Sequence, residues 1–481
     1  MPVRRGTLTW TMVAVGGAAL MVLALLAAPA LAPAAALAIA AVAWIVFAGQ
    51  RPLAAYLTVL FIFTLAYNRL ALPLAVGGAG ERVGTLSLGD VLWLGLVAGW
   101  LLARLCRWQP RPPALRLPRV AWLLAPYVLM DLLLPVAGVL VRGWPASFAV
   151  PGLRHLEWAS FGAFAYSLAR RHGTGFLLSR LIGMLLAACG LHLAYALVQA
   201  GYSVGMLSSA WIVLDLLYVA QSGFSWFHYP RVTGLLINPN AFGVFGAFVG
   251  VLGVALLLEP RAKGWATTAF TLIFALVALL MSSSRSALVG EAVALAALGM
   301  FTVGQRRLTS RLWAVGLVAL LVVLVVIMVW PFLPGILQAR LSSLLEMYGG
   351  TGVDENAAGR LAAWEEVWEV YVNDYPLGTW VPTGHATGLV ADSYYVQSAA
   401  QGTPLFTLAW LVFLGAAAAL GWQAYRRAGG ALEAAAGLTL VGWAGVMVGA
   451  NLTLTAMHDA NLVALFWMML GVAAAVARGR S

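Results

Sequence analysis

One uncharged stretch decides the fold class: Leu312-Trp-Ala-Val-Gly-Leu-Val-Ala-Leu-Leu-Val-Val-Leu-Val-Val-Ile-Met-Val-Trp330. A run of about 20 apolar residues crosses the hydrocarbon core of a bilayer as a helix, because a helix satisfies its own backbone hydrogen bonds. Comparable runs recur from one end of the chain to the other. They lack the alternation of apolar and polar residues that marks membrane β-strands. The sequence therefore predicts an all-α polytopic membrane protein.

The composition of the whole chain supports this prediction. Of its 481 residues, 62% are hydrophobic and 9% are charged, whereas about a quarter of the residues in a soluble domain are charged. We predict about 12–14 membrane-spanning helices. The candidate segments are approximately 8–28, 31–49, 53–70, 86–105, 120–141, 152–169, 175–199, 233–257, 265–281, 286–304, 312–333, 403–422, 431–451 and 457–477.

The basic residues predict the orientation of these segments. If the N-terminus is cytoplasmic, most of the 28 arginine and lysine residues fall in every second connection or at the two termini. This is the positive-inside pattern, so the net charge of +11 indicates membrane topology and not nucleic-acid binding. Segments 200–232, 282–285 and 334–402 then lie on the periplasmic side of a bacterial inner membrane.

The connection 334–402 is the only long one, and it divides the chain. We predict a first part of the transmembrane bundle at 1–333, a periplasmic loop at 334–402 and the rest of the bundle at 403–481. Long loops in compact architectures are usually functional. Within this loop, apolar residues at three- and four-residue steps predict an amphipathic helix at the membrane surface; they are Leu361, Trp364, Trp368 and Tyr371.

Two arginines stand at the predicted outer ends of spans. Arg231 precedes Asn238-Pro-Asn240, whose amides are costly at that depth unless they face a polar cavity. Arg285 follows Ser282-Ser-Ser284, whose hydroxyls can cap the next helix, and a guanidinium beside a helix N-terminus suits a phosphate. The alternative is a pair of interfacial arginines at capped helix starts. Because both arginines flank the same two predicted spans, we favour a shared anion site.

Two residues of the long loop are candidates for a general base. Asp392 is the last carboxylate before the next span, where partial desolvation suits proton transfer. His385 is the competing candidate. The alternatives are a solvated carboxylate that caps a turn and a solvated histidine.

Motifs for other chemistries are missing from the sequence. It contains no Walker loop for ATP-driven transport and no His, Cys or Asp cluster spaced for a metal ion. We therefore expect neither a cofactor nor a metal. A diphosphate leaving group would then depend on protein cations, and Arg231 and Arg285 have the right chemistry.

Three fragments in this order resemble the O-antigen ligase and O-antigen polymerase superfamily. The first is Arg-x-x-Gly with Asn-Pro-Asn at 231–240, and the second is Ser-x-Ser-Arg-x-x-x-x-Gly at 282–290. The third comprises Gly-Arg, Trp, Pro-Leu-Gly, Asp-Ser-x-Tyr and Gly between 359 and 402. The similarity covers about residues 225–415, which is the expected catalytic region.

The resemblance implies a metal-independent, inverting glycosyltransferase whose donor is a glycan on undecaprenyl diphosphate. It assigns the diphosphate to Arg231 and Arg285, and the base to the position of Asp392. The other motif residues are expected to bind substrate: Asn238, Asn240, Ser284, Arg360, Trp364 and Tyr395. Ligases that load glycan onto lipid A-core usually have His at the position of Asp392, whereas polymerases more often have an acidic residue. Polymerase is therefore slightly favoured, unless His385 reaches the site.

A transporter or flippase of polysaccharide or lipid is the alternative class. Its relay groups would be the acidic residues within or beside the spans: Asp90, Asp131, Glu157, Asp215 and Asp459. No internal repeat of half the chain length is evident, and the arginine motifs share one side, so we favour the transferase. A structural scaffold would not need polar groups at the ends of its spans.

Overall fold

The computed structural model describes residues 32–66, 71–74, 84–106, 108, 117–203, 205–212, 214–215, 231–236, 238–259, 261–302, 316, 355–389 and 391–479. Two predicted segments lie outside these residues: 8–28, and 312–333 with the exception of residue 316. Each of the other predicted segments coincides with a described helix, so the prediction of a helical fold is confirmed. Among the described helices, nine are long and apolar enough to cross a membrane.

The chain divides into two compact units, one of residues 1–63 and 70–114 and the other of residues 64–69 and 115–481. The first unit contains α2 (Ala32–Gln50), most of α3 (Pro52–Ala66) and α4 (Leu88–Leu105). It also contains an antiparallel pair of short strands, β1 (Ala71–Leu74) and β2 (Gly84–Ser87), that the sequence did not predict.

In this first unit α4 starts with a capping box. The backbone N–H of Asp90 donates to Ser87 Oγ at 3.1 Å, and the N–H of Ser87 donates to Asp90 Oδ2 at 2.6 Å. Asp90, one of the acidic residues considered for a transport relay, is thus engaged as a helix cap.

The second unit is a bundle of helices and short 3-10 turns. Its elements are η2 (Arg119–Leu124), α5 (Ala125–Arg142), η3 (Ala146–Ala149), α6 (Val150–His172), α7 (Thr174–Ser203), η4 (Ser209–Ile212), α9 (Pro239–Leu258), α10 (Trp265–Ser282), α11 (Arg285–Thr302), α14 (Glu355–Asp374), α15 (Thr383–Ala386), α16 (Tyr394–Arg427), α17 (Ala431–Ala450), η7 (Ala456–His458) and α18 (Ala460–Arg478). The helices α9, α17 and α18 are almost wholly buried and form its core.

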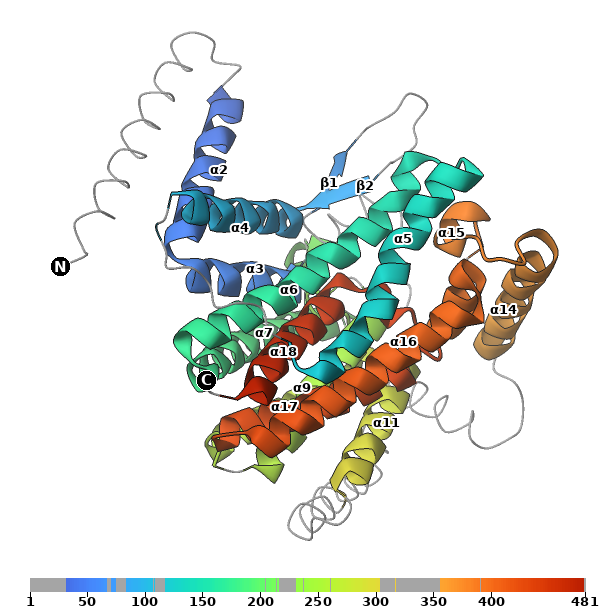
Figure 1. The fold of residues 1–481 in the computed structure, drawn as a ribbon. Coiled ribbons are helices and arrows are strands. Elements are labelled where there is room, and N and C mark those ends of the chain that lie inside the picture. The colour runs from blue at the N-terminus through green and yellow to red at the C-terminus, as the bar shows by residue number, and fades with distance from the viewer. Residues whose placement is uncertain are drawn as a thin grey trace. The chain divides into compact units, whose positions relative to one another are not determined.

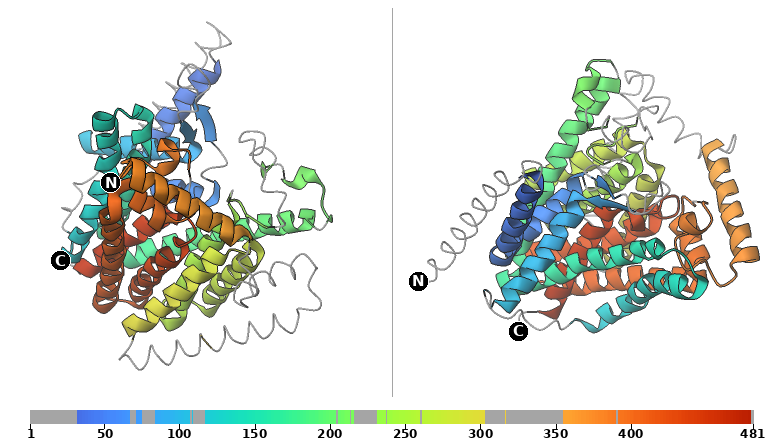
Figure 2. Two further views of the ribbon diagram at one scale, coloured as in Figure 1. Left: turned by 90° about the vertical axis from the view of Figure 1, so that its right-hand side faces the viewer. Right: turned by 90° about the horizontal axis from the view of Figure 1, so that it is seen from above.

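Small residues allow the core helices to approach closely. A Cβ atom on Gly246 of α9 would lie 2.7 Å from Ala278 Cβ of α10, and one on Gly253 would lie 2.8 Å from Thr271 Oγ1. Such small residues replace a hydrophobic driving force between helices in a membrane, because close backbone approach increases van der Waals contact. As a result α9, α10 and α11 lie side by side (Figure 2).

The connections of the second unit gather at two ends. At one end Arg170 Nη1 donates to Gly479 O at 2.7 Å, and Lys263 Nζ donates to Ser179 Oγ at 3.0 Å. At the other end the Tyr394 N–H donates to Asn451 O at 3.0 Å, and the hydroxyl oxygens of Ser286 and Thr453 lie 2.7 Å apart. This grouping agrees with the alternation that the charge pattern predicts.

The predicted amphipathic helix is present as α14, but its buried face differs from the prediction. Val367 and Tyr371 are buried and Trp364 is partly buried, whereas the side chains of Leu361 and Trp368 are 55% and 46% exposed. The reason is that α14 packs against the segment 391–400 at the start of α16, which turns the stripe of Trp364, Val367 and Tyr371 inward. Figure 1 shows α14 and α15 beside this end of α16.

The helix α16 is kinked where the predicted span begins. Gly402 and Thr403 have non-helical backbone angles, Thr403 has a φ of 68°, and Pro404 follows. Proline lacks an N–H and cannot continue the hydrogen-bond ladder of the preceding turn. The kink separates the first turns, 394–401, from the long apolar part that ends at Arg427.

Candidate functional site

The side chain of Arg231 lies across the turn that joins α10 to α11. Its Nε donates to Ser282 O at 2.7 Å, and its Nη2 donates to Ser283 O at 3.3 Å and to Asn240 Oδ1 at 2.6 Å. The Val232 N–H adds a bond to Met281 O at 3.2 Å. A segment that precedes α9 is thereby attached to the three serines that precede Arg285.

Arg285 is the first residue of α11 and is partly exposed. Ser283 just before it has a left-handed backbone with a φ of 48°, which ends α10, and Ser284 Oγ accepts from the Ala287 N–H at 3.3 Å, which caps α11. The Arg285 side chain therefore starts from a helix N-terminus, where the helix dipole favours an anion. The carbonyl that Arg231 Nη2 contacts belongs to Ser283, two residues before Arg285 in the chain.

The glycine at position 243 allows α9 to reach this turn. A Cβ atom there would lie 2.6 Å from Ser282 Oγ and 2.6 Å from Ser284 Cβ. Any larger residue at 243 would displace the serine turn. The position of the turn relative to α9 therefore depends on the absence of a side chain.

The two asparagines of the first motif have different partners. Asn238 is the N-cap of α9, and its Oδ1 accepts from the Asn240 N–H at 2.8 Å. The side chain of Asn240 accepts from Arg231. The predicted segment 233–257 had placed both amides within the span, and this prediction was wrong. Because α9 begins at Pro239, both amides stand at the start of the helix.

The residues of the third motif surround the start of α16. Arg360 Nε of α14 lies 3.7 Å from Asp392 Oδ2, and the Asp392 side chain is 61% exposed. Trp364 belongs to the cluster that attaches α14 to α16. Tyr395 points to α17, where its hydroxyl donates to Val448 O at 3.1 Å. The backbone of His385 lies in α15, and its side chain is outside the described part of the chain.

The loop 451–459 between α17 and α18 was not predicted as part of the site, yet it connects the motifs. Asn451 O accepts from the Tyr394 N–H beside Asp392, and the hydroxyl of Thr453 contacts Ser286 beside Arg285. The Met457 N–H donates to Asn451 Oδ1 at 3.3 Å and closes the loop. The signal was available, since polar residues gather here between two apolar segments on the predicted outer side.

A cluster of titratable side chains lies next to this loop. His155 Nδ1 of α6 is 2.6 Å from Asp131 Oδ2 of α5, and both residues are buried. The ring of His458 lies 6.1 Å from that of His155 and 5.4 Å from that of Tyr394. The sequence indicated Asp131 only as an isolated acid, because its partner is on another helix. At the end of the loop, burial raises the pKa of the Asp459 carboxyl to about 6.

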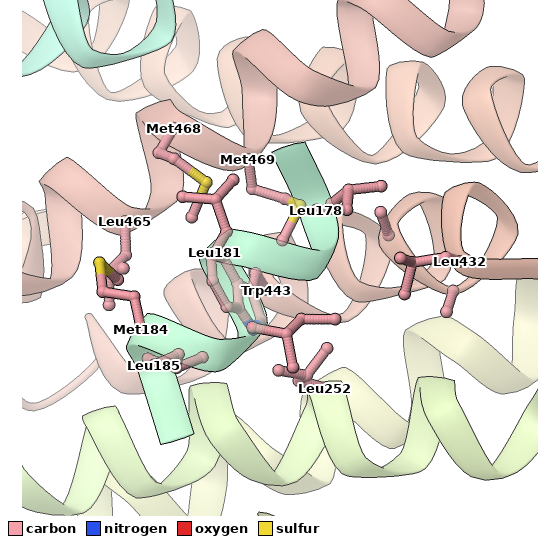
Figure 3. Close-up of a pocket in the computed structure, with 13 residues that line it drawn as sticks. Leu178, Leu181, Met184, Leu185, Leu252, Leu432, Trp443, Leu465, Met468 and Met469 are labelled. Carbon is pink, nitrogen blue, oxygen red and sulfur yellow. The ribbon is translucent and has the colours of Figure 1, made fainter. Parts of the chain in front are cut away.

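An apolar cavity of about 20 Å³ lies elsewhere in the second unit, between α7, α9, α17 and α18. Figure 3 shows Leu181, Met184, Leu252 and Trp443 in its wall. All of its lining residues are apolar, so it has no polar group to orient a headgroup or a sugar. Within the described part of the chain, no group of three or more His, Cys, Asp or Glu side chains is arranged for a metal ion.

Comparison with known proteins bears on the centre of the chain. Residues 270–422 match the family model described as O-Antigen ligase. The chain contains an O-antigen ligase family domain. The O-antigen ligase match includes Arg285, Arg360 and Asp392, whereas Arg231 and the two asparagines precede it. No curated protein matches the chain significantly. The match confirms the family resemblance for residues 270–422.

Proposed function

We propose that this protein transfers a glycan from undecaprenyl diphosphate to an acceptor hydroxyl at the periplasmic face of a bacterial inner membrane. The observation that carries the proposal is the position of Arg231 on the Ser282–Ser283 carbonyls, immediately before Arg285. The Arg231 guanidinium is thus held at the turn from which Arg285 and the N-terminus of α11 begin. Bidentate guanidinium groups and helix N-termini are preferred partners of phosphate oxygens.

The reaction follows from this arrangement. The acceptor hydroxyl attacks the anomeric carbon, and the bond from that carbon to the phosphate oxygen breaks, so the diphosphate leaves with the bonding electrons. Arg231 and Arg285 stabilise the charge that develops on it. Asp392 takes the proton of the attacking hydroxyl, and Arg360 holds the Asp392 carboxylate. Trp364, Tyr395, Asn238, Asn240 and Ser284 then shape the surroundings of the substrates.

The acceptor decides between polymerase and ligase. The test is to reconstitute the chain in liposomes with an undecaprenyl-diphosphate-linked glycan and either lipid A-core or a second lipid-linked repeat unit. We expect release of undecaprenyl diphosphate together with extension of one of the two acceptors, measured by mass spectrometry. Extension of the lipid-linked repeat indicates a polymerase, and loading of lipid A-core indicates a ligase. No release with either acceptor would contradict the proposal.

Asp392→Asn is expected to lower kcat about 100- to 1000-fold, because the amide has the same shape but cannot accept the proton. The Kd of the donor should change less than about twofold, since Asp392 takes no part in binding the diphosphate. Both are measured on the purified protein with the reconstituted assay. Asp374→Asn, at the exposed end of α14, is the matched control and should behave as wild type. Equal losses in kcat and donor binding would indicate a folding defect and argue against the base.

A further inference from the structure

The segment that carries Arg231 needs support from outside itself. Residues 231–236 form neither helix nor strand, and the Leu236 N–H donates to Thr233 O at 3.1 Å in a turn within them. Backbone N–H groups in a buried segment require partners. Two of them are supplied by side chains of α7: the Leu235 N–H donates to His192 Nδ1 at 3.1 Å, and the Thr233 N–H donates to Gln199 Oε1 at 3.0 Å.

The oxygen and the nitrogen of the Gln199 side-chain amide both form hydrogen bonds to this segment, and the nitrogen also binds Asp215. While Oε1 accepts from the Thr233 backbone, Nε2 donates to Thr233 Oγ1 at 2.8 Å and to Asp215 Oδ2 at 2.9 Å. The Tyr195 hydroxyl donates to the same carboxylate oxygen at 2.7 Å. Gln199, Asp215 and Thr233 are all buried.

The hydrogen bonds determine the orientation of the Gln199 amide. A backbone N–H only donates, so the atom facing Thr233 N is the oxygen, and the nitrogen therefore faces Asp215. In turn Tyr195 and Asp215 hold Gln199 in place. Buried hydrogen-bond networks of this kind specify one geometry, because a shifted arrangement leaves polar groups unpaired.

We propose that Gln199 is the positioning residue for Arg231: it anchors Thr233, two residues along the chain, so that the guanidinium stays on the Ser282–Ser283 turn in the orientation that receives a lipid diphosphate. This inference rests on the proposed function. Gln199 touches neither the substrate nor the reacting atoms. It acts through the backbone between Thr233 and Arg231, and Tyr195 and Asp215 support it.

The test is a double-mutant cycle on the Kd of undecaprenyl diphosphate, measured by calorimetric titration of the detergent-solubilised full chain. Gln199→Leu should weaken binding about tenfold, which is the size of one or two lost hydrogen bonds. In the Arg231→Ala background the same change should have no further effect, because a residue that acts only through Arg231 loses its role with it. A further tenfold loss in that background, or wild-type binding by Gln199→Leu, would overturn the proposal.

Tyr195→Phe provides a milder variant in case Gln199→Leu does not fold. It removes the Tyr195 hydroxyl that donates to Asp215. Binding should weaken about threefold in the otherwise wild-type chain and not at all in the Arg231→Ala background. Equal losses in both backgrounds would show a general structural role and overturn the proposal. Gln423→Leu, a glutamine of α16 at the opposite end of the bundle, is the matched control and should bind as wild type.

The same titrations separate this inference from the proposed function. If the wild-type chain binds no undecaprenyl diphosphate, or if Arg231→Ala binds it unchanged, the diphosphate site itself is wrong and the inference fails with it. If Arg231→Ala weakens binding while Gln199→Leu and Tyr195→Phe bind as wild type, the diphosphate site stands and the role of Gln199 alone is refuted.

Discussion

Arg285→Ala and Arg231→Ala are each expected to abolish glycan transfer, a loss of at least about 100- to 1000-fold in kcat/KM. This is the typical effect of removing one group that stabilises developing charge. Arg285 follows the turn at 282–284, and the guanidinium of Arg231 is hydrogen-bonded to that turn, so each variant removes one of the two cations proposed for the leaving diphosphate. The measurement is transfer by the reconstituted protein, together with surface glycan in cells and quantification of the protein in the membrane.

Lysine should restore little of this activity at either position. Arg231 uses Nε and Nη2 at the same time, on Ser282 O and on Asn240 Oδ1, and an ammonium group cannot reproduce that fork. Arg426→Ala is the matched control, because Arg426 is exposed at the opposite end of the bundle. Normal surface glycan from both alanine variants would remove the proposed diphosphate site.

Gly471→Ala is expected to destabilise the bundle by at least about 3 kcal/mol, which is the upper range for overpacking a core. A Cβ atom on Gly471 of α18 would overlap the backbone carbonyl of Gly162 on α6. Neither helix can yield locally, since a Cβ atom on Gly162 would itself lie 2.8 Å from Trp467 O. The measurement is the apparent Tm of the detergent-solubilised protein and its yield as a monodisperse species.

Gly299→Ala is the control for this change. Gly299 lies inside α11, and a Cβ atom there would meet no heavy atom within 4 Å. Alanine favours a helix interior over glycine by about 1 kcal/mol, so this variant should be as stable as wild type or slightly more stable. An equal Tm for the two alanine variants would show that α6 and α18 do not pack through Gly162 and Gly471.

Within the described part of the chain, the approximate positions of the apolar helices followed from the sequence alone. An apolar run long enough to cross a bilayer has few alternatives to a helix, because no water is present to satisfy the backbone. The helix in the long loop was predictable from its period. The serine motif before Arg285 was correctly expected at the end of a helix, whereas the two asparagines were placed within a span and lie at the start of α9.

What the tertiary structure alone decided is which residues meet. The core helices α9 and α18 are apolar on every side, so their sequences contain no period that indicates which face contacts which neighbour. For this reason the contact of Arg231 with the serine turn, the Gln199 network and the pairing of Asp131 with His155 were not predictable. The sequence shows polar residues gathered in the loop 451–459 between two apolar segments, but only the packing of α11, α16 and α17 places them between the motifs.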